Sequence, residues 1–442
     1  MAAKDLETIV ALCKRRGFLF PGSEIYGGFG GTWDYGPLGV ELKRNIKEAW
    51  WNDMVHRRDD VVGLDAAIMM NPKVWEASGH VESFADPLVE CKTCHERIRA
   101  DQEDVIKLHE EGHRTNKEEV SWTAPRNFNL LVKAFVGVVE EAERPIYLRG
   151  EITQGVYVNF RNVVDSVHPK IPFGIAQVGK AFRNEITPGN FTFRSREFEQ
   201  MELQYFVKPD EAEGKKWFAY WKQARMDWYV SLGMGKEHLR FREHAPDERA
   251  HYAKEAWDIE YHSPFGWKEF EGIHHRADWD LSRHQKFSGK DLTYTDQESG
   301  EQYTPWGIET SGGADRATLF FLLDAYDEEG GGDDRRVVLR LHPRIAPLKV
   351  AIFPLLANKP ALIEKAQSIY KTLKHEFVTA WDARGNIGKR YRSQDEIGTP
   401  FCVTVDFDTL SDNTVTMRDR DTMKQERIKI DELVRYLHDR LS

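Results

Sequence analysis

The stretch of residues 181–206, AFRNEITPGNFTFRSREFEQMELQYF, constrains the fold more than any other part of the chain, because it has the pattern of two strands joined by a turn. Gln200, Glu202 and Gln204 alternate with the apolar Met201, Leu203, Tyr205 and Val207, a period of two that is typical of a strand burying one face. Thr187-Pro188-Gly189-Asn190 is a turn sequence, since proline fixes φ and glycine and asparagine tolerate positive φ. We therefore expect a hairpin with one buried face and one polar face.

The polar side chains of this hairpin have the chemistry of a nucleotide site. Arg183 and Glu185 are two residues apart on the first arm and are expected to share a face, and Arg194 and Phe198 follow them. A guanidinium binds phosphate through charge-assisted hydrogen bonds, and an aromatic ring can stack on a base. The sequence thus predicts a site for an anionic nucleotide.

Length and composition bound the class of protein. A chain of 442 residues is too long for one core and fits two or three domains. It has no apolar run near the ~20 residues that cross a bilayer, and its charged N-terminus does not have the pattern of a signal peptide. Four scattered cysteines favour a reducing compartment. We expect a cytoplasmic protein with no membrane partner.

Three further segments predict helices and strands in the larger part of the chain. Residues 37–56 predict an amphipathic helix, and residues 61–69 predict a strand after it. Residues 306–326, WGIETSGGADRATLFFLLDAY, predict a strand, a Gly-Gly turn and an apolar helix. Arg316 would lie in the first turn of that helix, where free N–H groups and the helix dipole attract phosphate.

The last hundred residues predict a separate α/β module. Gly330-Gly331-Gly332, Pro343 and Pro347 mark a hinge, after which short strands and helices alternate. The net charge of −10 argues against a protein that coats nucleic acid without specificity, but a local basic face could still bind a folded RNA. The candidates for that face, which could equally be solvated charges, are Lys389, Arg390, Arg392, Arg418, Arg420, Lys424 and Arg427.

One cysteine and histidine spacing is close to that of a zinc site. Cys91-x2-Cys94 is followed after fourteen residues by His109-x3-His113. The two histidines, however, lie in the charged run DVIKLHEEGH, which predicts a helix, and histidines four residues apart are common in helices. From the sequence we therefore expect no structural zinc and no protein-bound metal.

The FRNE and REFEQME segments resemble motif 2 of the class II aminoacyl-tRNA synthetases, and specifically the homodimeric glycyl-tRNA synthetases. The resemblance extends from CKRRGFLFPGSEIYGGFGGTWDYGPLG near the start to TVTMRDRDTMKQERIKIDELVRYL near the end. It implies an α+β fold, with an antiparallel sheet flanked by helices over residues 1–345 and an α/β anticodon-binding domain over 346–442. Within the first part it places motif 1 at about 37–72, insertions at about 88–125 and 209–300, motif 2 at about 175–207, and motif 3 at about 306–326.

The resemblance also implies the reaction and its residues. Glycine and ATP would form glycyl-adenylate, and the glycyl group would pass to the 3′ end of tRNA(Gly), with Mg²⁺ on the phosphates and a homodimer as the active form. Arg183, Glu185 and Arg316 would be catalytic. The implied ATP-binding residues are Arg183, Asn184, Glu185, Phe193, Arg194, Phe198, Glu269, Phe270, Gly313 and Arg316. The implied glycine-binding residues are Arg99, Glu151, Phe198, Glu202, Glu309 and Ser311.

Two positions depart from the family pattern. Gly150 and Thr310 replace prolines beside the glycine-site carboxylates, while the carboxylates themselves remain. These changes motivate an alternative, a non-catalytic relative that binds nucleic acid or assists a polymerase. Such a relative should have lost the phosphate-binding arginines, and this chain retains Arg183 and Arg316. A class II enzyme for another amino acid is the third possibility, and QMELQYF together with the glutamate-rich pocket argues against it.

Overall fold

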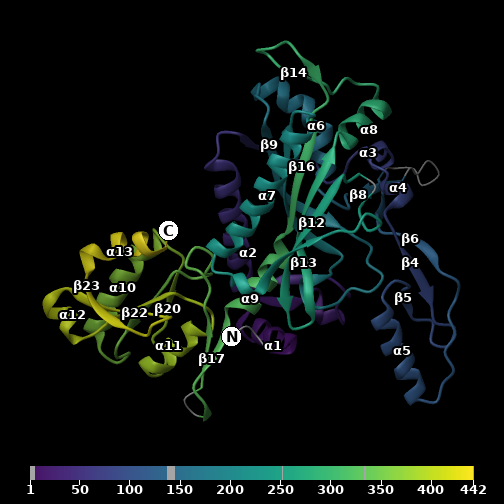
Figure 1. The fold of residues 1–442 in the computed structure, drawn as a ribbon. Coiled ribbons are helices and arrows are strands. Elements are labelled where there is room, and N and C mark those ends of the chain that lie inside the picture. Colours follow the sequence, from purple (N-terminus) through teal and green to yellow (C-terminus); the bar gives the residue numbers. More distant parts are fainter. Residues whose placement is uncertain (1–4, 137–144, 251, 333–334, 442) are drawn as a thin grey trace.

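A seven-stranded sheet forms the centre of the larger part of the molecule (Figure 1), in a computed structural model that describes residues 5–136, 145–250, 252–332 and 335–441. Neighbouring strands are antiparallel, except that the short edge strand β3 runs parallel to β9. In spatial order the strands are β11 (Leu239–Glu243), β12 (Glu255–Ser263), β13 (Gly266–Ala277), β16 (Trp306–Gly313), β10 (Glu197–Val207), β9 (Phe173–Phe182) and β3 (Val61–Gly63).

Helices cover this sheet and enclose its apolar side chains. The helix α2 begins at Pro37, whose fixed φ suits the first helical position, and it packs against the apolar helix α9. The principal helices of this part are α1 (Leu6–Arg16), α2 (Pro37–Trp51), α6 (Thr153–Val167), α7 (Glu211–Ser231), α8 (Trp279–Ser288) and α9 (Ala314–Ala325). The α+β class, with helices flanking an antiparallel sheet, is confirmed.

The apolar stripe of α2 is buried within the chain itself. Leu42 and Ile46 are fully buried, and Ala49 is 6% exposed, all in the core that also contains α9. The stripe is therefore covered within the chain and gives no argument for a second chain, although the resemblance implies a homodimer. The predicted strand at 61–69 is also shorter than expected, because only Val61–Gly63 pairs with β9.

The hairpin β9–β10 has the predicted alternation, but its polar face is not open to solvent. Gln200, Glu202 and Gln204 are all buried, and Gln200 and Glu202 line a cavity rather than the outer surface. The first strand ends at Phe182, so Arg183 and Glu185 lie just beyond it rather than in regular strand.

The predicted Gly-Gly turn before α9 is instead part of a strand. β16 continues through Gly313, and α9 begins at the next residue, Ala314. A Cβ at residue 312 would lie 2.9 Å from Oε2 of Glu271, so glycine allows this carboxylate to pack against the strand. Arg316 lies in the first turn of α9, as the sequence predicted.

The segment at about 88–125, which the resemblance implies is an insertion, has regular structure and belongs to an arm beside the main sheet (Figure 1). A three-stranded sheet of order β5-β4-β6 carries one helix along it. Its elements are β4 (Ala85–Glu90), β5 (Arg97–Arg99), α5 (Glu103–Thr115) and β6 (Arg126–Asn129).

The last hundred residues form a separate five-stranded α/β layer, as expected, with its own hydrophobic core (Figure 1). Strand order is β20-β19-β21-β22-β23, with the first three parallel and the last two antiparallel. The elements are β19 (Val350–Pro354), α10 (Pro360–Lys374), β20 (Thr379–Trp381), α11 (Ile387–Asp395), β21 (Phe401–Val405), α12 (Phe407–Asp412), β22 (Thr414–Asp419), β23 (Gln425–Lys429) and α13 (Leu433–Leu441).

Three of the seven basic residues proposed for an RNA face are buried structural groups. Arg418 donates to both oxygens of Asp395 at 2.8 and 2.9 Å, and the same carboxylate accepts from Arg336 of the larger part. Arg390 and Arg420 are each 2% exposed and donate to backbone carbonyls. These three arginines bond within the module, and Arg336 joins the module to the rest of the chain.

The remaining elements are short, and they connect the larger units. They are β1 (Leu19–Pro21), β2 (Trp33–Tyr35), α3 (Pro72–Ala77), α4 (His80–Ser83), β7 (Val132–Phe135), β8 (Pro145–Leu148), β14 (Tyr294–Thr295), β15 (Gln302–Tyr303), β17 (Tyr326–Glu329) and β18 (Arg336–Leu339). No helix among the described residues is long and apolar enough to cross a membrane.

Candidate active site

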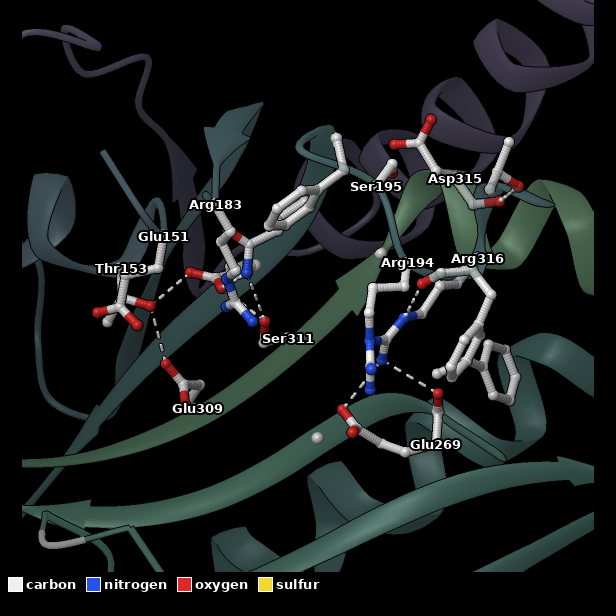
Figure 2. A pocket seen from close by; sticks show the side chains of 18 of the residues that line it. Glu151, Thr153, Arg183, Arg194, Ser195, Glu269, Glu309, Ser311, Asp315 and Arg316 are labelled. Carbon is white, nitrogen blue, oxygen red and sulfur yellow. Dashed lines mark hydrogen bonds and ion pairs between the residues drawn. The ribbon is translucent and has the colours of Figure 1, made fainter. Parts of the chain in front are cut away.

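One cavity opens on the polar face of β10, β13 and β16 and collects most of the predicted site residues. Strand register explains this, because Glu202 lies opposite Ser311, and Glu309 lies opposite both Gln204 and His274. Side chains directly opposite in neighbouring antiparallel strands have Cβ atoms about 4.5–5.5 Å apart. Figure 2 shows Glu151, Thr153 and Glu309 at one end, Arg183 and Ser311 between, and Arg194, Glu269 and Arg316 at the other end.

Three buried carboxylates form the first end of the cavity. The Thr153 hydroxyl lies 2.6 Å from Oε2 of Glu202 and 3.0 Å from Oε1 of Glu309. Ser311 donates to Oε1 of Glu202 at 2.5 Å, and Gln200 donates to the same oxygen at 2.8 Å. Glu202 and Glu309 are 1% and 2% exposed, so their charges are poorly solvated by water.

The carboxylates differ in their affinity for protons. Burial raises the pKa of Glu202, and the nearby charges of Glu309 and Glu151 raise it further, to about 8. Burial also acts to raise the pKa of Glu309, but Arg276 and His274 outweigh it and hold that pKa well below its usual value. The Thr153 hydroxyl has one proton, so a protonated Glu202 donating to Thr153, which donates to Glu309, satisfies all three groups.

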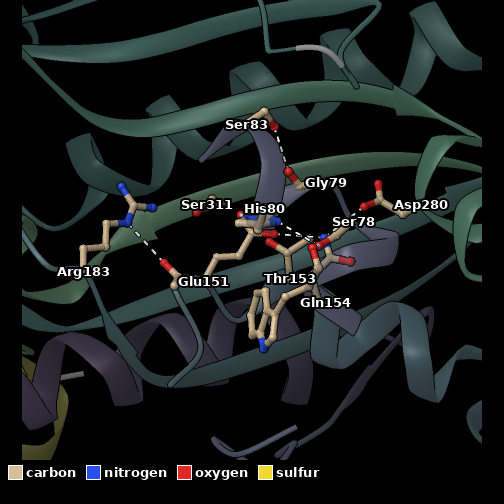
Figure 3. Close-up of polar contacts among 12 residues, drawn as sticks. Ser78, Gly79, His80, Ser83, Glu151, Thr153, Gln154, Arg183, Asp280 and Ser311 are labelled. Carbon is tan, nitrogen blue, oxygen red and sulfur yellow. Dashed lines mark hydrogen bonds and ion pairs between the residues drawn. The ribbon is translucent and has the colours of Figure 1, made fainter. Parts of the chain in front are cut away.

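Glu151 completes the cluster with its own set of partners (Figure 3). His80 lies 3.3 Å from its Oε2, and Gln154 donates to its Oε1 at 2.9 Å. Burial acts to raise the pKa of Glu151, but the charges of His80 and Arg276 lower it to about 2. Glu151 and Glu309 are thus anionic at neutral pH.

Arg276 anchors the cluster from behind. Its guanidinium donates to Asp280 at 2.7 and 2.9 Å and to Glu309 at 3.1 and 3.2 Å. His274 contacts Glu309 through Nδ1 at 2.6 Å. Asp280 forms an ion pair with Arg276 and neutralises much of its positive charge. This end of the cavity therefore keeps an excess of negative charge, which suits a small cation.

Arg183 lies in the middle of the cavity. Its Nε donates to the carbonyl of Gly150 at 3.1 Å, and its guanidinium carbon lies 5.2 Å from the ring centroids of Phe84 and of Phe198. Its two terminal nitrogens donate to none of the residues that the structure describes. The side chain is therefore held in place by its inner nitrogen and by two rings, while its outer nitrogens stay available to an anion.

Arg316 and its neighbours form the second end. Its Nε donates to the carbonyl of Phe193 at 3.1 Å, and Nη1 lies 3.4 Å from Oε1 of Glu269. Glu185 is buried, with Arg194 4.0 Å from its Oε2, and that oxygen accepts no hydrogen bond from the described residues. Guanidinium groups and a carboxylate without a hydrogen-bond donor face the cavity here, ready to pair with a polar ligand.

Asp315, which the sequence did not single out, fixes the start of α9. Its Oδ1 accepts from the Tyr35 hydroxyl at 2.6 Å and from Lys43 at 2.8 Å, and its Oδ2 accepts from the amide of Glu199 at 2.6 Å. These bonds tie α2, the hairpin and α9 together. The position of Arg316, the next residue, follows from them.

Most of the predicted residues line this cavity, and two do not. Arg99 pairs with Asp86 at 2.5 Å and with Asp101 at 2.6 Å, outside the lining. Asn184 is exposed and bonds through its backbone to Leu130. Their proposed roles stay predictions. The predicted residues that line the cavity are Glu151, Arg183, Glu185, Phe193, Arg194, Phe198, Glu202, Glu269, Phe270, Glu309, Ser311, Gly313 and Arg316.

Sequence reasoning missed several lining residues that come from other elements. Thr153 is the first residue of α6 and lies two residues after Glu151, so its nearness in sequence could have suggested it. His274 and Gly272 are found only through the pairing of β13 with β16, which no local pattern reveals. The missed lining residues are Thr153, Thr192, Ser195, Gln200, Tyr252, Gly272, His274 and Asp315.

The two family departures fit their surroundings. A Cβ at Gly150 would lie 3.0 Å from Phe84 and 3.2 Å from Leu131, so glycine allows both side chains to approach. Thr310 is 1% exposed in the centre of β16, opposite Leu203 and Ile273. Neither change removes a charged group from the cavity.

Known proteins resemble the chain over nearly its whole length. A family model described as an anticodon binding domain matches residues 349–440. The glycine–tRNA ligase of Caldanaerobacter subterraneus subsp. tengcongensis is 53% identical, covering 99% of this chain and 98% of that protein. Those of Treponema denticola and Geobacillus kaustophilus are 54% and 52% identical over 97% and 100% of this chain, and over 96% and 100% of their own. The chain belongs to the glycine–tRNA ligase family.

Proposed function

We propose that the cavity binds glycine at its carboxylate end and ATP at its arginine end, as the site at which this ligase aminoacylates tRNA(Gly) for protein synthesis. One observation carries the proposal: an anionic cluster and two arginines with accessible nitrogens share a single cavity on adjacent strands. The glycine carboxylate would attack the α-phosphorus and release pyrophosphate. A ribose hydroxyl of the terminal adenosine would then attack the carbonyl carbon and release AMP.

The carboxylate end selects glycine by charge and by size. The ammonium group would bind among Glu151, Glu202 and Glu309, whose charges it offsets. The hydroxyls of Thr153 and Ser311 fill the space between the carboxylates, which leaves little volume beside the α-carbon. Glycine is the smallest amino acid, so exclusion by volume is sufficient for specificity.

The arginine end stabilises negative charge on ATP. Arg183 would bind the α-phosphate, where charge develops during attack, and Arg316 would bind the γ-phosphate. Phe198, now packed on Arg183, would stack on adenine. The protein supplies no nucleophile, so catalysis is positioning together with neutralisation of phosphate charge.

Mg²⁺ fits the arginine end. Glu269 offers a partly exposed carboxylate there, and Mg²⁺ prefers oxygen ligands while keeping several waters on the phosphates it binds. When bound, the ion would neutralise phosphate charge. Glu309 is not a suitable ligand, because Arg276, His274, Gln204 and Thr153 already surround its oxygens.

The C-terminal module would bind the anticodon end of tRNA(Gly). The family match to an anticodon binding domain supports this assignment. With Arg390, Arg418 and Arg420 buried, the contacts to phosphate must come from exposed basic residues such as Lys389 and Lys424.

A homodimer remains our proposal for the active form, on a different surface from the stripe of α2. Ile25, Tyr26 and Phe29 are 88, 86 and 61% exposed around the β1–β2 turn, and Val40 is 48% exposed on α2. Exposed apolar patches of this kind mark protein interfaces. Sedimentation at micromolar concentration should show twice the mass of 51.3 kDa; a stable monomer would contradict it.

The proposed compartment is the cytoplasm, where the four free cysteines stay reduced.

Paired variants at the two ends test the assignment. Ser311→Ala should raise the KM for glycine in ATP–pyrophosphate exchange and leave the KM for ATP nearly unchanged, whereas Arg316→Ala should do the reverse. The physical reason is that Ser311 donates to Glu202 of the carboxylate cluster, whereas Arg316 lies at the arginine end of the cavity. An equal loss for both substrates in both variants would show that the two ends are not separate subsites. The non-catalytic alternative predicts no exchange at all.

A further inference from the structure

A cluster of two cysteines and two histidines lies in the arm beside the main sheet (Figure 1), and none of the four lines the cavity. Cys91 and Cys94 flank a tight turn between β4 and β5, where the amide of Cys91 donates to Glu96 and the amide of His95 donates to Cys91. α5 lies across this turn and contributes His109 and His113, which share one helix face because they are four residues apart.

The ligand atoms converge at distances that match a tetrahedral metal. The Nε2 of His113 lies 3.8 Å from Sγ of Cys91, 3.4 Å from Sγ of Cys94 and 3.1 Å from Nε2 of His109. Sγ of Cys94 lies 3.5 Å from Nε2 of His109, and all four atoms are within 4.8 Å of one another. Ligands at about 2.3 Å for sulfur and 2.0–2.1 Å for nitrogen around a tetrahedral zinc are separated by about 3.3–3.8 Å.

The outer nitrogens of both histidines are held by carboxylates. Nδ1 of His113 lies 2.6 Å from Glu118, and Nδ1 of His109 lies 3.1 Å from Glu96. An ionised carboxylate only accepts, so each Nδ1 carries a proton and each Nε2 is directed at the cluster. The two Nε2 atoms lie 3.1 Å apart and both face Sγ of Cys94, so the ligand atoms point to one centre. Carboxylate–histidine–metal arrangements of this kind orient zinc ligands.

We propose that Cys91, Cys94, His109 and His113 bind a structural zinc ion that fastens α5 to the turn between β4 and β5. Zinc is the metal that suits two thiolates and two imidazoles, and four protein ligands leave no open position for chemistry. This reverses the expectation from sequence. The histidine spacing alone indicated only a helix, whereas the fold brings that helix face against both cysteines.

Metal analysis of the untagged, full-length protein tests the proposal. We expect one zinc ion per chain in the purified protein, or after incubation with Zn²⁺ and dialysis. Replacement of zinc by Co²⁺ should give the intense visible absorption of a tetrahedral thiolate site together with a thiolate-to-cobalt charge-transfer band. A chain that holds neither metal, or a cobalt spectrum of octahedral type, would overturn the proposal.

Variants locate the ion. Cys94→Ser and His113→Gln should each lose most of the bound zinc, and proteolysis should then cut between residues 91 and 122 faster than in the parent. The matched control is His95→Asn, because His95 lies in the same turn with positive φ but directs its ring to Glu90 at 3.2 Å. It should retain zinc. The same zinc content per chain in all three variants would place the ion elsewhere and refute the assignment. If a variant does not fold, the cobalt spectrum of the parent protein tests the proposal instead.

Discussion

Binding of glycine should release a proton from Glu202. In the empty cavity, burial and the charges of Glu309 and Glu151 raise the pKa of Glu202 to about 8, so this carboxyl is mostly protonated at neutral pH. An ammonium group placed beside it favours the ionised form, which lowers the pKa and expels the proton. Proton release on glycine binding should therefore be large at pH values below the raised pKa of Glu202. It should fall toward zero as the pH rises through that pKa.

The pKa sets the expected magnitude. One pH unit below a pKa of about 8, protonated and ionised forms stand at roughly ten to one, so glycine should release about nine-tenths of a proton at pH 7. Isothermal titration of glycine in buffers of different ionisation enthalpy measures this number directly. At pH 9 the same titration should show little release, because Glu202 is then already ionised.

Two variants complete this test. Glu202→Gln keeps the shape of the side chain but cannot ionise, so release should disappear and the KM for glycine should rise by about 10- to 150-fold, the equivalent of the 1.5–3 kcal/mol of a charged hydrogen bond. The control is Glu197→Gln, an exposed carboxylate on the same strand that pairs with Lys180, and it should behave as the parent. Unchanged release in Glu202→Gln would refute the reasoning.

Three further changes test other parts of the account. Arg183→Ala should lower ATP–pyrophosphate exchange by about a hundredfold or more, since one donor to developing charge contributes about 3 kcal/mol, and circular dichroism should show the fold intact; activity within a few-fold of the parent would remove the phosphate assignment. Thr310→Val should raise the free energy of unfolding in urea by about 1 kcal/mol, because the buried Thr310 hydroxyl has no partner among the described residues, and a loss of stability would contradict this. Lys389→Glu combined with Lys424→Glu should weaken tRNA charging and leave ATP–pyrophosphate exchange unchanged. If the double variant charges tRNA as fast as the parent at both low and high salt, this surface does not bind tRNA.

Local periodicity predicted the elements that carry the site. The alternation along β10, the turn before it and the apolar run of α9 are local signals, so their positions could be read from the chain. The resemblance to a family then supplied the roles of Arg183, Arg316 and the carboxylates. Those residues share a cavity, but their roles await the experiments above.

The sequence could not show which buried charges pair across the fold. Arg276 is an ordinary strand residue in sequence, and only the pairing of β13 with β16 and the approach of α8 give it Glu309 and Asp280 as partners. Similarly, Arg418 has the sequence pattern of a surface charge, but in the fold it donates to the buried carboxylate of Asp395. These contacts join residues that are distant in sequence, and a periodic pattern within one segment cannot predict them.

ATP–pyrophosphate exchange measured with glycine, alanine, serine and each other amino acid in turn tests the central claim most directly. The account predicts rapid exchange with glycine alone, because the ammonium binds among Glu151, Glu202 and Glu309 while Thr153 and Ser311 exclude any side chain. Exchange that is as fast with alanine or serine, or that is absent with glycine, would contradict it.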